Sequence, residues 1–110
     1  MNTQLSEHHP WARTEEEKSA YVRMQEQLLD RRALLAELEP HAAPHIDAAA
    51  WAVVLSIRAT IGQIAAALTR LESGTYGLCL TCGDALDPDR VEIFPYTESC
   101  VPCQKEADKR

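Results

Sequence analysis

Four cysteines place the strongest constraint on how this chain can fold. Cys79 and Cys82 form one CxxC pair, Cys100 and Cys103 form another, and residues 83–99 separate the pairs. This spacing is typical of a zinc site with four thiolate ligands. Because four thiolates leave no coordination position for water, the sequence predicts one structural Zn²⁺. Its binding would stabilise a segment too short to build a core of its own.

Other roles for the cysteines remain open at this point. The two CxxC pairs could be redox-active, the thiols could be free, or the zinc could be released reversibly on oxidation. A disulfide framework is disfavoured, because the N-terminal stretch MNTQLSEHHPW has no basic region followed by an apolar run and so does not resemble a secretion signal. Gly83, directly after the first pair, supplies the backbone freedom that a metal-binding turn requires.

The first helix is predicted from about residue 15 to about residue 39. Thr14 followed by Glu17 has the form of a capping box, and Pro40 should end the helix. Arg31 interrupts the apolar stripe, where it could weaken the coil, set its register or extend to solvent. The stripe has spacings close to those of a helix and consists of Tyr21, Met24, Leu28, Leu35 and Leu38.

A stricter stripe predicts the second helix over about residues 47–73, with Gly74 just past its end. Its members, three or four residues apart, are Ala50, Val54, Ile57, Ile61, Ile64, Leu68 and Leu71. The short connection forces the two helices to run antiparallel. We therefore expect a mainly α fold, in which an antiparallel, coiled-coil-like helical hairpin is followed by a small four-cysteine zinc finger.

The predicted organisation has three parts. Residues 1–13 form a flexible tail, residues 14–73 form the hairpin with its tip at residues 40–47, and residues 74–110 form the finger with a short C-terminal tail. No window has the roughly 18 apolar residues that a membrane span requires. The sequence therefore predicts a cytoplasmic protein without membrane contact. No catalytic set of residues is visible, so we do not expect an enzyme.

Charge argues against nucleic acid as the partner. The chain has 11 Lys and Arg against 17 Asp and Glu, a net charge of −6, which repels phosphate backbones. The cysteine spacing also occurs in DNA-reading fingers of the GATA type, but here Arg90 is the only basic residue between the two pairs. The acidic residues in that interval are Asp84, Asp87, Asp89, Glu92 and Glu98. Direct, sequence-specific DNA binding is not expected.

The segment from residue 67 to residue 104 resembles the C-terminal zinc finger of the DksA/TraR family of bacterial transcription regulators. The likeness comprises the Leu-Glu-x-Gly-Thr-Tyr-Gly lead-in at Leu71–Gly77, the CxxCG turn, the Arg-x-Glu-x-x-Pro segment at Arg90–Pro95 and the closing CxxC. Members of this family place a long helical hairpin beside the finger, as the apolar periodicity also predicts here. The motif covers about a third of the chain and the architecture most of it.

The resemblance implies a non-enzymatic, monomeric protein that binds RNA polymerase by inserting its hairpin tip through the secondary channel and thereby modulates initiation. It assigns polymerase contact to Asp47 and Ala49, which match the second acid and the alanine of the family's Asp-x-x-Asp-x-Ala tip motif. Pro44 stands where the first acid belongs. The segment 104–110 is too short to repeat the longer C-terminal helix of larger members, and no residue matches a role in binding the alarmone ppGpp.

Simpler structural roles compete with these assignments. Asp47 could act as the N-cap of the second helix, with or without a partner contact. Trp51 could anchor a partner, although covering the open end of the hairpin is the favoured role. The loop imidazoles of His41 and His45, like those of His8 and His9, are expected to be solvated. The alternative function is a zinc-dependent protein-interaction or redox-switch module without polymerase activity.

Overall fold

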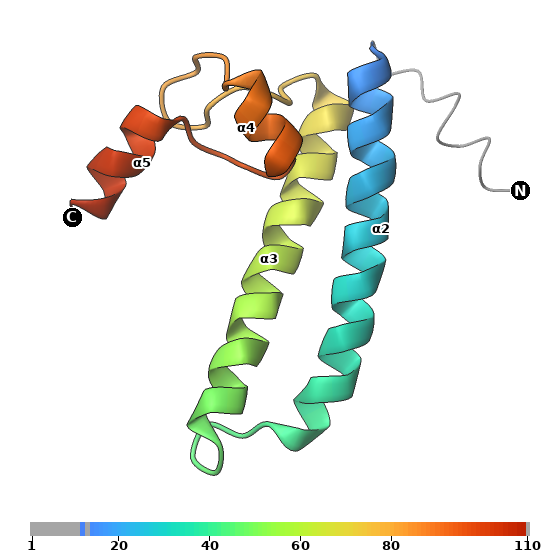
Figure 1. Cartoon of the computed structure of the whole chain (residues 1–110), viewed down its shortest axis with the longest axis vertical. Helices are drawn as coiled ribbons and strands as arrows, with labels where there is room; N and C mark the ends of the chain where they lie inside the picture. Colours follow the sequence, from blue (N-terminus) through green and yellow to red (C-terminus); the bar gives the residue numbers. More distant parts are fainter. Residues whose placement is uncertain (1–11, 13, 110) are drawn as a thin grey trace, which may run out of the picture.

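The computed structural model describes residue 12 and residues 14–109, and it is mainly helical (Figure 1). Its elements are α2 (Glu15–Leu38), the 3-10 turn η1 (Glu39–His41), α3 (Ala48–Ser73), α4 (Pro88–Ile93) and α5 (Val101–Asp108). Over this range the β structure consists of a single antiparallel bridge between Leu78 and Ala85. The predicted mainly α fold is confirmed. The predicted tail, residues 1–13, lies outside the described residues except for Ala12.

The long helices begin and end at the residues that the sequence marks. The Thr14 hydroxyl accepts a hydrogen bond from the backbone N–H of Glu17 at 3.0 Å, which satisfies a donor that the first turn leaves free. At the other end of the hairpin, α2 ends at Leu38 and Pro40 lies in η1. Gly74 ends α3 in the left-handed conformation, at φ 86°, which is favourable for glycine.

The α2–α3 seam forms a core at the end of the hairpin near the finger. Its buried members are Ala20, Met24, Leu28, Ile64, Ala67 and Leu71. Tyr76 and Tyr96 of the finger pack against this cluster, so the finger and the hairpin share one apolar core. All the predicted seam positions are buried or half-buried.

The core thins toward the tip. On α2 the buried residues end at Leu28, and on α3 the tip half contributes only Val54 and Ile57 to the buried set. Arg31 lies half-buried on the seam, and Leu35 is also half-buried. The tip half is therefore held together by less apolar burial than the half beside the finger.

Helix α3 corrects the expectation that no segment could span a membrane. By length and composition alone it is a candidate span, with a mean hydropathy of 1.5 over its most apolar 18-residue window. The expectation failed because it required an uninterrupted apolar run, whereas many alanines between the large apolar residues, with Arg58 as the one charge from Ala48 to Thr69, keep the average hydropathy high. The core helix of a soluble protein can have the same length and hydropathy as a membrane span. Helix α3 supplies one side of the hairpin core, although only 22% of this window is buried.

Two short helices were not predicted. Asp87 is the N-cap of helix α4, and its carboxylate accepts a hydrogen bond from the N–H of Asp89 at 2.9 Å. Pro88 is the first residue of the helix. Both are ordinary start signals of a helix. Helix α5 begins inside the second CxxC pair and extends to Asp108. The segment predicted as a short C-terminal tail is thus helical for most of its length.

Candidate metal centre

The fold brings together the four cysteines that the sequence singled out. The sulfur atoms of Cys79, Cys82, Cys100 and Cys103 all lie within 4.8 Å of one another. The Sγ atoms of Cys82 and Cys100 are 3.8 Å apart, which is far longer than a disulfide bond. Four sulfurs about 2.3 Å from a tetrahedral zinc ion would be separated by roughly this distance. The donor set and its spacing fit one zinc ion.

Backbone hydrogen bonds shape the first half of the site. The N–H of Gly83 donates to the carbonyl of Cys79 at 2.9 Å, and the N–H of Cys79 donates to the carbonyl of Asp84 at 2.8 Å. This tight turn requires φ of 82° at Gly83, as expected for the glycine after the first pair. The N–H of Thr81 also points to the Cys79 sulfur, at 3.4 Å. The turn directs both sulfurs of the first pair to one point.

The second half of the site is the start of α5. Cys100 is the N-cap of this helix, and Cys103 lies in its first turn. Thiolates at a helix N-terminus are stabilised by the exposed N–H groups and by the helix dipole. The N–H of Leu80 donates to the carbonyl of Glu98 at 2.8 Å. This bond joins the two halves, so residues distant in sequence face one another across the site.

The thiols are too close together to ionise independently. Hydrogen bonds from the backbone at Cys100 and Cys82 lower the pKa of the Cys79 thiol to about 6. Hydrogen bonding to the Cys100 thiol raises the pKa of Cys103 to about 12. One sulfur is thus prepared as a thiolate at neutral pH while another holds its proton. A divalent cation would replace that proton and allow all four sulfurs to carry charge.

Zinc binding is therefore expected to release protons and to weaken as the pH falls. Protons compete with zinc for the same sulfurs, and each proton released per zinc makes the apparent Kd about tenfold larger for each unit fall in pH. Competition with a chelator of known affinity between pH 6 and pH 8 would measure this slope. Calorimetry in two buffers of different ionisation enthalpy would count the protons. An affinity independent of pH would contradict thiolate ligation.

Two side chains of the hairpin, Arg23 and Arg70, donate hydrogen bonds to the finger, and Tyr76 forms a bond within the finger. The Tyr76 hydroxyl donates to the carbonyl of Pro95 at 2.8 Å, and Arg23 of α2 donates to the carbonyl of Glu92 at 3.1 Å. Arg70, which is buried near the end of α3, donates to the carbonyl of Thr97 at 3.4 Å. The sequence analysis did not identify these contacts. Tyr76 was visible as part of the lead-in motif, but its partner depends on tertiary packing.

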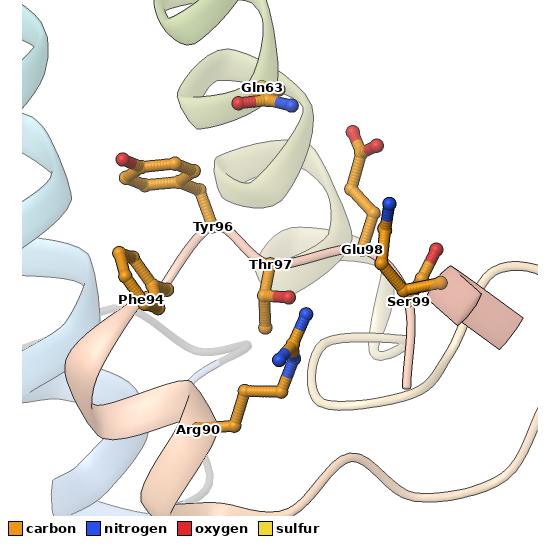
Figure 2. A pocket seen from close by; sticks show the side chains of 8 residues that line it. Gln63, Arg90, Phe94, Tyr96, Thr97, Glu98 and Ser99 are labelled. Atoms are coloured by element: carbon orange, nitrogen blue, oxygen red, sulfur yellow. The ribbon is translucent and has the colours of Figure 1, made fainter. Parts of the chain in front are cut away.

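A small polar cleft of about 170 Å³ lies where the finger meets α3. Figure 2 shows Gln63 on α3 above the segment Tyr96–Ser99, with the guanidinium of Arg90 directed toward that segment. Arg90 comes from α4, and its Nε atom is buried without a hydrogen-bond partner among the described residues. The acidic Glu98 lines the same cleft. Arg90 of the recognised motif therefore lies at the junction between finger and hairpin.

The predicted tip residues lie at the opposite end of the hairpin from the cysteines (Figure 1). Asp47 is exposed and is the N-cap of α3, because its Oδ1 accepts a hydrogen bond from the N–H of Ala50 at 3.0 Å. Ala49 is exposed in the first turn of α3. The loop residues His41 and His45 are exposed, whereas Trp51 is half-buried. The structure therefore places the cysteine centre and the predicted tip residues at opposite ends of the hairpin.

The sequence profile of the prokaryotic DksA/TraR C4-type zinc finger matches residues 74–109, which include all four cysteines. Residues 74–109 are a DksA/TraR zinc finger. The resemblance inferred from the Leu71–Gly77 lead-in and the cysteine pairs is confirmed for this part of the chain. The zinc site of the DksA/TraR finger is of the closed, four-cysteine type, with its ligand positions arranged for one ion.

Solved structures with the same fold include two DksA proteins. One is the RNA polymerase binding protein and transcriptional regulator Dks from Chlamydia trachomatis, with 23% sequence identity and a TM-score of 0.52 over 88% of this chain and 93% of that chain. The other is the transcription factor DksA2 from Pseudomonas aeruginosa, with 21% identity and a TM-score of 0.52 over 82% of this chain and 75% of that chain. At these identities the likeness establishes the fold, a hairpin with a DksA/TraR finger.

A curated relative also shares part of the sequence. An uncharacterised protein of Aquifex aeolicus is 37% identical over 51 residues. The matched segment covers 46% of this chain and 35% of the length of that relative. The matched segment is longer than the DksA/TraR finger but leaves most of the relative unmatched.

Proposed function

We propose that this protein is a zinc-containing bacterial transcription regulator that binds RNA polymerase through the secondary channel and modulates initiation. The observation that carries the proposal is the combination of a DksA/TraR finger at residues 74–109 with a long antiparallel hairpin. The two solved proteins of the same fold are described as an RNA polymerase binding protein and a transcription factor. The proposed partner is RNA polymerase itself rather than promoter DNA, which the net charge of −6 would repel.

The two ends of the molecule have different proposed roles. We assign zinc ligation to Cys79, Cys82, Cys100 and Cys103, and we take residues 74–110 as the unit that fixes the base of the hairpin. The hairpin unit, residues 14–73, carries the tip at residues 40–47 into the channel. The protein acts as a cytoplasmic monomer, without chemistry of its own. The closed zinc site suits this role because it offers no open coordination position for a reaction.

Asp47 is the proposed acidic contact at the tip, with Ala49 beside it. Its carboxylate is exposed while one oxygen caps α3, so the same side chain can fix the helix start and present a charge. Pro44 occupies the place of the first acid in the family motif. This tip therefore presents one carboxylate where the family motif has two. We expect a regulator whose effect depends on Asp47 alone among the tip acids.

Two substitutions of Asp47 separate the capping role from the contact role. Asparagine is as good an N-cap as aspartate but carries no charge, whereas alanine loses both properties and costs about 1 kcal/mol of stability. We expect Asp47→Asn to keep the wild-type unfolding midpoint yet to lose most of the effect on initiation in a reconstituted transcription assay. Asp47→Ala should lose both. Wild-type regulation by Asp47→Asn would show that the carboxylate makes no functional contact.

A further inference from the structure

Arg58 is the only charged residue between Ala48 and Thr69, the stretch that forms most of α3. The other charged residues of α3, Arg70 and Glu72, lie at its finger end, so Arg58 is the one charge that α3 carries near the tip. Arg58 lies in the tip half of the hairpin, where the buried core is thin. Its side chain is partly exposed, at 46% of its full accessible area.

The Arg58 guanidinium contacts two groups at once. Its Nε atom donates to Oε2 of Glu39 at 3.1 Å, and its Nη2 atom donates to the same oxygen. The guanidinium carbon also lies 5.2 Å from the centre of the Trp51 ring, within the range of a cation–π interaction. Glu39 is the first residue after α2, and Trp51 lies in the first turn of α3. Arg58 therefore links the end of one helix to the start of the other.

The loop between these points has few other restraints. Its backbone hydrogen bonds are local, from Ala42 to Glu39 at 3.2 Å and from Ile46 and Asp47 to Ala43 at 3.2 and 2.9 Å. These bonds shape the turn but do not orient it relative to α3. Ile46, the large apolar residue of the loop, is 79% exposed, so apolar burial in the loop is limited to the small side chains of Ala42 and Ala43, which are half-buried. The Asp47 cap fixes the loop at one end, and Arg58 fixes it at the other.

We propose that Arg58 is a positioning residue, which holds the end of α2 against α3 through Glu39 and Trp51 and so sets the direction of the tip. An exposed ion pair and one cation–π contact contribute little to global stability. Their effect is local, because they restrain a loop that the core does not reach. The part of this proposal that concerns partner binding rests on the proposed function.

Amide exchange in the free protein tests the positioning role directly. Arg58→Met retains helix propensity and an apolar stem but loses the guanidinium. We expect exchange at Ala42 and Asp47 to quicken roughly three- to tenfold, while exchange at the core residues Ile64 and Ala67 stays at the wild-type rate. Arg32→Met, the same change at an exposed position of α2, is the control and should change neither set. Unaltered exchange at the tip of Arg58→Met would overturn the proposal.

A second experiment swaps the charges of Glu39 and Arg58. Arg58→Met should weaken binding of the full chain to core RNA polymerase several-fold, and Glu39→Gln should do the same. The double variant Glu39→Arg with Arg58→Glu should restore slow tip exchange and part of the lost affinity, because it rebuilds the ion pair. Failure of the double variant to restore tip exchange would show that no such pair acts. If wild type itself does not bind polymerase, the proposed function fails while the exchange result still decides the role of Arg58.

Discussion

Replacing Cys100 with serine is expected to abolish zinc binding and to unfold the finger, while the α2–α3 hairpin remains largely helical. Zinc contributes roughly 10–16 kcal/mol to the folded form of small zinc domains. The finger has few buried residues of its own, with Cys79, Leu86 and Pro95 among them. Without the ion, this burial cannot offset the entropy of ordering the segment. Zinc content per chain, circular dichroism and the dispersion of amide resonances from residues 74–109 would measure the loss.

The matched control for that experiment is Thr81→Ala. Thr81 lies inside the first CxxC pair and is exposed, so the change keeps all four sulfurs and the backbone N–H that points to Cys79. We expect the control to retain one zinc per chain and a folded finger. A Cys100→Ser protein with the same zinc content and the same finger resonances as wild type would show that this thiol is not a ligand.

Truncation of Ile64 to alanine is expected to destabilise the zinc-loaded protein by about 2–5 kcal/mol. Ile64 is fully buried, at 0% exposure, in the cluster that both helices and the finger share. Its removal deletes buried methyl groups and leaves a cavity at the part of the hairpin that carries most of the core. Chemical denaturation at saturating zinc, followed by helical circular dichroism, would give the change in the free energy of unfolding.

Leu55→Ala is the control on the same helix. Leu55 is 48% exposed, and its truncation should cost well under half as much, because little of its surface is removed from water on folding. Equal losses for the two variants would contradict the assignment of Ile64 to the core. They would also indicate that the exposed face of α3 is covered in solution.

The hairpin was predictable because its signals are local. Thr14, Asp47 and Gly74 mark helix ends by chemistry that acts within one turn. The apolar stripe of each helix needs only the period of the helix to be read. The same holds for the metal centre, since the spacing of the two CxxC pairs and Gly83 define most of the site before any tertiary contact is known.

The remaining features depend on tertiary placement. Arg70 and Arg23 donate to finger carbonyls more than 25 residues away in sequence, which no local pattern encodes. The link from Arg58 to Glu39 crosses the hairpin and requires its register. Asp87 and Pro88 are a local signal for the start of a helix, so α4 could have been predicted from sequence. The sequence prediction used the acidic residues of this segment only as an argument about charge. The helical state of the C-terminal segment was missed because its start lies inside the second CxxC pair.

The apolar character of α3 was also underestimated from sequence. Counting an unbroken apolar run missed a helix whose average hydropathy is high because its polar residues are small and mostly uncharged. Burial in the hairpin accounts for one face of this helix, including Val54, Ile57 and Ile64. The opposite face near the tip carries Ala48, Ala52 and Leu55, which are exposed in the free protein.

Direct binding of the full, zinc-loaded chain to core RNA polymerase tests the central claim. The measurement is an affinity determined by a solution method, with a competitor that occupies the secondary channel added in a second series. We predict saturable one-to-one binding that the competitor abolishes and that Cys100→Ser weakens strongly. No binding to core polymerase at micromolar concentrations, or binding that the channel competitor leaves unchanged, would contradict the account.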